Sequence, residues 1–158
     1  MTVQTRIGHV HLKVRDLDRA IEFYTRHFNL SVVERIGPYY AFLSGGEMHH
    51  EVALQNVGPQ APSAEARGVG LYHVAFEVPD ARSFALAYRQ LREDGVAVSL
   101  VDHVISWAMY FDDPDGNGLE IYWDTRQEPH GKPTWQGHNA PLYPAQLDEI
   151  LNSAPDPE

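Results

Sequence analysis

Two segments of the chain alternate between apolar and polar residues in a way that is typical of β-strands. The first spans residues 7–14 and the second spans residues 71–78. In the first, Val10, Leu12 and Val14 share one face, whereas Ile7, His9, His11 and Lys13 share the other. After each segment, apolar residues recur every three or four positions, which predicts an amphipathic helix, and Asp16 or Asp80 stands in front as the expected N-cap.

Strand-forming sequence follows each predicted helix. It lies near residues 31–36, 39–44 and 49–55 in the first half, and near residues 96–101, 106–112 and 118–123 in the second. The order β-α-β-β-β therefore occurs twice, which predicts an α+β fold of two tandem βαβββ modules that form a curved mixed sheet.

The predicted organisation is one domain over residues 1–158. Within it we expect a first module at 5–56, a linker rich in Pro, Gly, Ala and Ser at 57–70, a second module at 71–125 and a C-terminal tail at 126–158. A short helix is expected in the tail at 144–152. The tail lies outside the repeat and is interpreted as a strap over the domain or a dimer contact.

The two strands at 7–14 and 71–78 share the pattern x-x-His-Val-x-[Leu/Phe]-x-Val-x-Asp, and the copies start 64 residues apart. The repeat places His9 and His73 at the same step of equivalent strands, which suggests a site with one imidazole from each half. His11 lies on the same face as His9 and could take its place, although the register against His73 favours His9.

A second match lies further along each half. Tyr40 precedes His50 by ten residues, and Tyr110 precedes Glu120 by the same ten. Superposing the halves therefore predicts that His50 stands opposite Glu120. His49 and His50 are adjacent, so on a strand only one of them can face the site, and the repeat selects His50.

Two imidazoles and one carboxylate on a common face can hold a divalent metal ion and leave other positions open. His9, His73 and Glu120 are the candidate ligands, and the curved sheet would surround this site. Such a donor set is typical of non-haem iron(II), and manganese, nickel and zinc suit similar donors.

Composition narrows the possible partners. The chain has 158 residues, with 12 Lys and Arg against 22 Asp and Glu, so its formal net charge is −10. This balance argues against nucleic acid or an anionic membrane as the main partner. There is no cysteine, which excludes thiolate ligands. The N-terminal residues have no signal-peptide core and no apolar run approaches the roughly 20 residues of a membrane span, so a cytoplasmic location is expected.

Two stretches resemble signatures of the vicinal oxygen chelate superfamily, the glyoxalase/bleomycin resistance/dioxygenase group. One is His-Val-x-Leu-x-Val-x-Asp-Leu-x-x-Ala-x-x-Phe-Tyr, from His9 to Tyr24, and the other is Asp-Pro-Asp-Gly-Asn-Gly-Leu-Glu, from Asp113 to Glu120. The resemblance covers about residues 5–125. It specifies the fold better than the reaction, because glyoxalase I, fosfomycin-inactivating transferases, epimerases and extradiol dioxygenases share this scaffold.

The run His49-His50-Glu51-Val52-Ala53-Leu54 is similar to the His-His-x-[Val/Leu]-Ala segment of type I extradiol dioxygenases. That resemblance implies that His50 is an acid/base residue rather than a ligand, and that Tyr110 and His103 act beside the substrate. Many larger extradiol dioxygenases carry an additional N-terminal domain, so the match is to the small single-domain members. His103 also lies two residues nearer Tyr110 than in those larger enzymes. Glyoxalase I usually has a glutamate ligand at the position that this comparison gives to His50.

The resemblance implies an iron(II)-dependent extradiol dioxygenase, with manganese(II) as an alternative metal, that opens the ring of a catechol with O2. It also implies a homodimer or higher homo-oligomer. A glyoxalase-like or thiol-transferase-like metalloenzyme of the same scaffold is one alternative. A metal-free module that binds an aromatic compound or drug is another.

Overall fold

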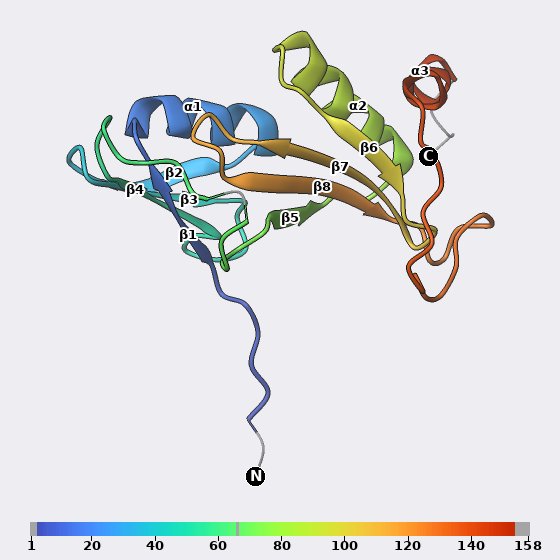
Figure 1. Cartoon of the computed structure of the whole chain (residues 1–158), viewed down its shortest axis with the longest axis horizontal. Helices are drawn as coiled ribbons and strands as arrows, with labels where there is room; N and C mark the ends of the chain where they lie inside the picture. Colours follow the sequence, from blue (N-terminus) through green and yellow to red (C-terminus); the bar gives the residue numbers. More distant parts are fainter. Residues whose placement is uncertain (1–2, 66, 154–158) are drawn as a thin grey trace. The chain divides into compact units, whose positions relative to one another are not determined.

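The structure is a computed structural model that describes residues 3–65 and 67–153. Its elements follow the predicted order of two βαβββ modules and a final helix, which confirms the α+β fold class (Figure 1). They are β1 (Val10–Val14), α1 (Leu17–Phe28), β2 (Ser31–Ile36), β3 (Tyr40–Ser44), β4 (Val52–Asn56), β5 (Val74–Glu77), α2 (Ala81–Glu93), β6 (Ser99–Asp102), β7 (Ser106–Asp112), β8 (Gly118–Asp124) and α3 (Pro144–Asn152).

The chain forms two compact units, each with its own four-stranded mixed sheet. Unit 1 runs to Gly70 and includes the turn Asp113–Asn117, and unit 2 consists of Leu71–Asp112 and the chain from Gly118 onward. That the whole chain acts as a single domain with a linker at 57–70 stays a prediction. No helix in the described part of the chain is long and apolar enough to cross a membrane.

Unit 1 has the strand order β1-β4-β3-β2, in which β1 runs parallel to β4 and the other neighbours are antiparallel. Helix α1 packs on this sheet (Figure 1). Its apolar stripe, with Leu17, Ala20 and Tyr24, is buried with the inward side chains Val14 and Leu54 of the sheet. This packing is what the helical spacing of those residues predicts.

Unit 2 has the equivalent order β5-β8-β7-β6, again with one parallel pair, β5 with β8. Helix α2 buries Phe84 and Leu91, and it packs against α3, where Leu147 is fully buried. Helix α3 occupies the predicted range 144–152.

The predicted helix caps are confirmed. The Asp16 side chain accepts a hydrogen bond from the Arg19 backbone N–H (3.0 Å), and the Asp80 side chain accepts one from Ser83 (2.6 Å). These aspartates satisfy N–H groups that have no partner inside the helix. Helix α1 ends at Asn29, whose φ of 52° lies in the left-handed region that asparagine tolerates.

The predicted strand starts were too early at the histidines. Strand β1 begins at Val10 and β5 at Val74, so His9 and His73 each precede a strand by one residue. Strand β4 begins at Val52, so His49 and His50 lie in the β3–β4 connection. Strand alternation therefore does not decide which of these two histidines faces the site.

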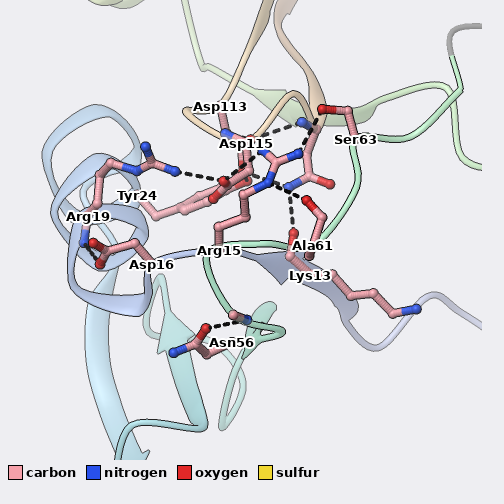
Figure 2. A network of polar contacts seen from close by, with 12 residues as sticks. Lys13, Arg15, Asp16, Arg19, Tyr24, Asn56, Ala61, Ser63, Asp113 and Asp115 are labelled. Carbon is pink, nitrogen blue, oxygen red and sulfur yellow. Dashed lines mark hydrogen bonds and ion pairs between the residues drawn. The ribbon is translucent and has the colours of Figure 1, made fainter.

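The turn Asp113–Asn117 is held within unit 1 by a polar network (Figure 2). Asp113 accepts hydrogen bonds from the buried Tyr24 hydroxyl (3.1 Å) and from the backbone N–H groups of Asp115 (2.8 Å) and Asn117 (2.9 Å). Burial, and then the Asp113 carboxylate, raise the pKa of Tyr24, so this hydroxyl keeps its proton and acts as a donor.

The same turn is also tied by charge. The Asp115 carboxylate is 4% exposed and lies 2.6 Å from the guanidinium of Arg19 and 3.4 Å from that of Arg15. Arg15 in turn donates to the Ala61 carbonyl (2.7 Å) and the Ser63 hydroxyl (2.7 Å), which anchors the segment after β4 (Figure 2). The Asp-Pro-Asp-Gly-Asn-Gly sequence is therefore a turn that also holds unit 1 together.

Candidate functional site

Two candidate site residues of unit 2, Tyr110 and Glu120, lie on one rung of its sheet, that is, at directly paired positions of neighbouring strands. Glu120 on β8 pairs with Tyr110 on β7 and with Ala75 on β5. His73 lies just before β5, and its Nε2 atom is 2.8 Å from the Glu120 carboxylate oxygen Oε2. A Cβ atom at Gly118 would overlap the Tyr72 carbonyl oxygen, so a glycine at the start of β8 allows the backbone before His73 to come close.

A chain of polar contacts continues from this rung. The Tyr110 hydroxyl lies 3.2 Å from Glu120 Oε1 and 2.8 Å from His103 Nε2. Burial, and then the neighbouring Glu120 carboxylate, raise the pKa of Tyr110, so its hydroxyl stays protonated at neutral pH. Unit 2 thus brings together four of the predicted site residues: His73, Glu120, Tyr110 and His103.

Two residues that were not among the predicted site residues extend these polar contacts beyond His103. Asn139 Oδ1 lies 2.6 Å from His103 Nδ1, and the Trp135 indole donates to the same oxygen at 3.0 Å. Both residues belong to the C-terminal tail, which lies outside the internal repeat. No repeat partner or motif marks them, so the sequence offers no signal that connects them with His103.

Unit 1 brings together the other two predicted residues, His9 and His50, whose ring centroids are 4.6 Å apart. His50 also lies against the Phe42 ring and has its Nδ1 atom 2.9 Å from that of His49. Partial burial, followed by the neighbouring His9 and His49, lowers the pKa of His50. A neutral imidazole is able to accept a proton.

The β3–β4 connection that carries the histidine pair is held by Glu51. Its carboxylate accepts hydrogen bonds from the backbone N–H groups of Gly45 (2.8 Å) and Met48 (3.3 Å). These bonds, together with one to Ser44, outweigh the raising effect of burial and lower the pKa of Glu51. Glu51 therefore stabilises the β3–β4 connection.

The predicted superposition of His50 on Glu120 is wrong. Glu120 pairs with Ala75 and Tyr110, and the same rung of unit 1 contains Ala53, which pairs with His11 and Phe42. The equal ten-residue spacing misleads because the β3–β4 connection, residues 45–51, is longer than the β7–β8 connection, residues 113–117.

The ladder keeps the two predicted histidine ligands in equivalent positions. His9 lies two residues before His11, which pairs with Ala53, and His73 lies two residues before Ala75, which pairs with Glu120. The two halves therefore match at the histidine but differ at the rung, where one has a carboxylate and the other a methyl group.

The donors of unit 2 suit a metal ion. Two ligands bound at about 2.1 Å and at right angles lie about 3 Å apart, which is close to the 2.8 Å between His73 Nε2 and Glu120 Oε2. Glu120 is 8% exposed, and His73 is its one basic partner among the described residues. A nearly buried carboxylate with so little compensation favours a cation.

Two further observations bear on this site. His73 Nδ1 is buried without a hydrogen-bond partner in the described part of the chain. Among the described residues, there is no group of three His, Asp or Glu side chains that could hold a metal ion. That His9, His73 and Glu120 together hold a metal ion stays a prediction.

The fold and these residues define a class of protein: two βαβββ modules, each with a histidine just before the first strand of its parallel strand pair, and with a carboxylate on the rung of the second module. The model of the Glyoxalase/Bleomycin resistance protein/Dioxygenase superfamily matches residues 6–121. The chain belongs to this superfamily.

Two curated proteins are similar to the chain. It is 34% identical over 133 residues to a catechol-2,3-dioxygenase of Bacillus subtilis (strain 168). This alignment covers 84% of this chain and 44% of that protein. It is also 34% identical over 133 residues to biphenyl-2,3-diol 1,2-dioxygenase 3 of Rhodococcus globerulus, with 82% and 68% covered. The chain thus spans less than half the length of the Bacillus protein.

A solved structure shows the same fold. The glyoxylase/bleomycin resistance protein/dioxygenase domain from Frankia sp. EAN1pec aligns with a TM-score of 0.67 and 23% identity. The alignment covers 81% of this chain and 98% of that domain.

Proposed function

We propose that this protein is an iron(II)-dependent extradiol dioxygenase that opens the ring of a catecholic substrate with O2. The observation that carries the proposal is the continuous contact chain of His73, Glu120, Tyr110 and His103 in unit 2. The similarity of the protein to two proteins named as dioxygenases of aromatic diols supports the same reaction.

His9, His73 and Glu120 would hold the metal, with manganese(II) as a second candidate. Bound iron(II) would supply a centre at which the two adjacent oxygens of a catechol and a molecule of O2 meet and exchange electrons. Carboxylate and imidazole ligands leave coordination positions open for both.

The other residues would handle protons. His50, whose pKa is lowered, would accept a proton from a catechol hydroxyl and return it during ring opening. Tyr110 would orient the substrate by a hydrogen bond, and His103 would support the Tyr110 hydroxyl from the other side. Aromatic side chains near His50, such as Phe42, suit a planar aromatic substrate.

The rung of unit 1 argues against the glyoxalase-like alternative. The position equivalent to Glu120 is Ala53, which is 1% exposed and has no donor atom in its side chain. A glyoxalase I with a glutamate ligand in each half would need a carboxylate there. The metal-free aromatic-binding alternative does not require the acidic rung of unit 2 at all.

The test is anaerobic reconstitution with iron(II), followed by a panel of substituted catechols and air, with absorbance recorded for the coloured ring-opened product. We expect product only with iron(II) or manganese(II). Stoichiometric iron without product, together with turnover of glutathione-linked substrates with nickel or zinc, would replace this proposal with the glyoxalase-like one. Failure to bind any divalent metal would favour the aromatic-binding module. A homo-oligomeric state and a cytoplasmic location also stay predictions of the proposal.

A further inference from the structure

The C-terminal tail of unit 2 brings an amide to the outer nitrogen of His103. Asp102 and Ala140 exchange two backbone hydrogen bonds, Asp102 N to Ala140 O at 3.1 Å and Ala140 N to Asp102 O at 2.7 Å. This short bridge aligns Asn139 with His103, whose Nδ1 atom lies 2.6 Å from Asn139 Oδ1. The contact is therefore fixed by backbone as well as by side chains.

Trp135 determines which way the Asn139 amide faces. An indole N–H can only donate a hydrogen bond, so the Asn139 atom 3.0 Å from it must be the carbonyl oxygen. That same oxygen faces His103 Nδ1. Turning the amide over would place its NH₂ group against the indole N–H, with two donors in contact. The acceptor character of the atom beside His103 is thus set by Trp135.

An acceptor beside Nδ1 determines where the imidazole proton lies. At 2.6 Å from an amide oxygen, Nδ1 must carry a proton, because two acceptors at that distance repel each other. In the neutral ring, Nε2 is then unprotonated and presents its lone pair to the Tyr110 hydroxyl, 2.8 Å away. We propose that Asn139, oriented by Trp135, is a positioning residue that fixes His103 as the Nδ1–H tautomer and directs its Nε2 lone pair at Tyr110.

The backbone at His103 supports this assignment. Val104 has a φ of 60°, a left-handed conformation that is costly for a β-branched residue. Three hydrogen bonds maintain it: Val104 N to Asp102 Oδ1 (2.7 Å), His103 N to Ser106 O (2.8 Å) and Lys132 N to Val104 O (2.7 Å). A turn held in a strained conformation by several bonds keeps the His103 ring in one place.

The consequence for the site rests on the proposed function. Tyr110 has one hydroxyl proton and two neighbouring acceptors, His103 Nε2 at 2.8 Å and Glu120 Oε1 at 3.2 Å. With His103 as the Nδ1–H tautomer, the Tyr110 hydroxyl donates its proton to the nearer acceptor, His103 Nε2. The lone pairs of Glu120 then stay available for a cation. The opposite tautomer would donate to Tyr110 and push the tyrosine proton towards Glu120. Asn139 thereby influences a proposed metal ligand through two intervening side chains.

The tautomer can be measured directly in the metal-free protein. Nitrogen-15 NMR of protein labelled in its histidine rings, at alkaline pH where imidazole is neutral, distinguishes protonated from unprotonated ring nitrogens. Comparison with the His103→Gln variant assigns the His103 signals. We expect a protonated Nδ1 and an unprotonated Nε2 in the wild type. Asn139→Ala and Trp135→Phe should each give a mixture of tautomers, whereas Asn139→Asp, which keeps an acceptor oxygen, should retain the wild-type form.

The exposed neighbour His138 provides the control, because His138→Ala should leave the His103 tautomer unchanged. In ring-cleavage assays, Asn139→Ala should lower kcat about 10-fold with little change in KM, and Asn139→Asp should restore most of the loss. A wild-type His103 protonated on Nε2, or a tautomer that survives both Asn139→Ala and Trp135→Phe, would overturn the inference. The expected tautomer in a protein that cleaves no catechol would instead count against the proposed function alone.

Discussion

The two units have the same strand order, but equivalent positions of their two sheets carry different side chains. In unit 2 the rung holds Tyr110 and Glu120, a phenol beside a nearly buried carboxylate. In unit 1 the positions equivalent to Tyr110 and Glu120 are Phe42 and Ala53, whose own side chains have no polar atom. Each unit nevertheless keeps a histidine at the equivalent position in front of its first strand. The two halves therefore share a histidine position, but only unit 2 has a carboxylate on the equivalent rung.

The turns beside these rungs differ in a related way. Each is stabilised by a carboxylate that accepts backbone N–H groups, Asp113 for the turn after β7 and Glu51 for the connection after β3. Asp113 is 4% exposed and also receives the Tyr24 hydroxyl, whereas Glu51 is only partly buried. The shorter turn is the more strongly fixed, and it immediately precedes the strand that carries Glu120.

The largest expected effect comes from making the rung of unit 2 resemble that of unit 1. Glu120→Ala should abolish stoichiometric iron(II) binding and lower ring cleavage by roughly 1,000-fold or more, because it removes the only charged ligand of the proposed site. Metal content and product absorbance measure both effects. Glu93→Ala, an exposed carboxylate on α2, is the matched control and should change neither. Wild-type iron affinity in Glu120→Ala would contradict the ligand assignment.

Replacing the phenol of the same rung should have a smaller effect. Tyr110→Phe copies Phe42 of unit 1 and should lower kcat by roughly 10-fold to 100-fold while iron still binds, because one hydrogen bond in the transition state is lost. Tyr122→Phe is the control, since its hydroxyl also contacts a carboxylate, Glu77 at 3.0 Å, and the pKa of Tyr122 is likewise raised, to about 12. Equal kcat values for the two variants would show that a tyrosine–carboxylate pair on this rung has no special role.

The difference between the turns should appear in stability. Asp113→Ala leaves the buried Tyr24 hydroxyl and two backbone N–H groups without their acceptor, so the free energy of unfolding should fall by about 3 kcal/mol. Urea denaturation measures the change. The exposed neighbour Asp112 supplies the control, and Asp112→Ala should have little effect. Similar losses in both variants would mean that the hydrogen bonds of Asp113 do not stabilise the turn.

The smallest expected effect is at Glu51, and it should depend on pH. Because the folded-state pKa of Glu51 is lowered from 4.5, its stabilising contribution is present above that value and is lost as the pH falls through the folded-state pKa. Glu51→Gln should therefore cost about 1 kcal/mol at neutral pH, and the difference from wild type should shrink in acid. Glu47→Gln, an exposed carboxylate in the same connection, is the control. A difference that persists unchanged at low pH would exclude the ionised carboxylate as its source.

Local features of the fold could be predicted from the sequence because a few neighbouring residues encode them. The caps Asp16 and Asp80 each satisfy an N–H group three residues ahead, and Asn29 ends α1 in the conformation that few other residues accept. The pairing of Tyr110 with Glu120 could also be predicted from the sequence, because a tight turn pairs the residues of its two strands at a fixed spacing.

The same spacing failed for Tyr40 and His50 because the connection between β3 and β4 is longer, and Tyr40 pairs instead with Gln55. Nothing in the sequence reports how many residues of a connection remain outside the ladder. Strand pairing between segments, and not the distance along the chain, decides which side chains share a rung.

The sequence by itself determined the duplicated βαβββ order, the histidine in each half and the turn before Glu120, because all of these depend on short-range patterns and hydrogen bonds. Only the tertiary structure decided that Ala53 is the counterpart of Glu120. It also decided that Asn139 and Trp135 reach His103. Those outcomes depend on pairing between remote strands and on the path of a tail with no repeat partner, and neither leaves a periodic signal in the sequence.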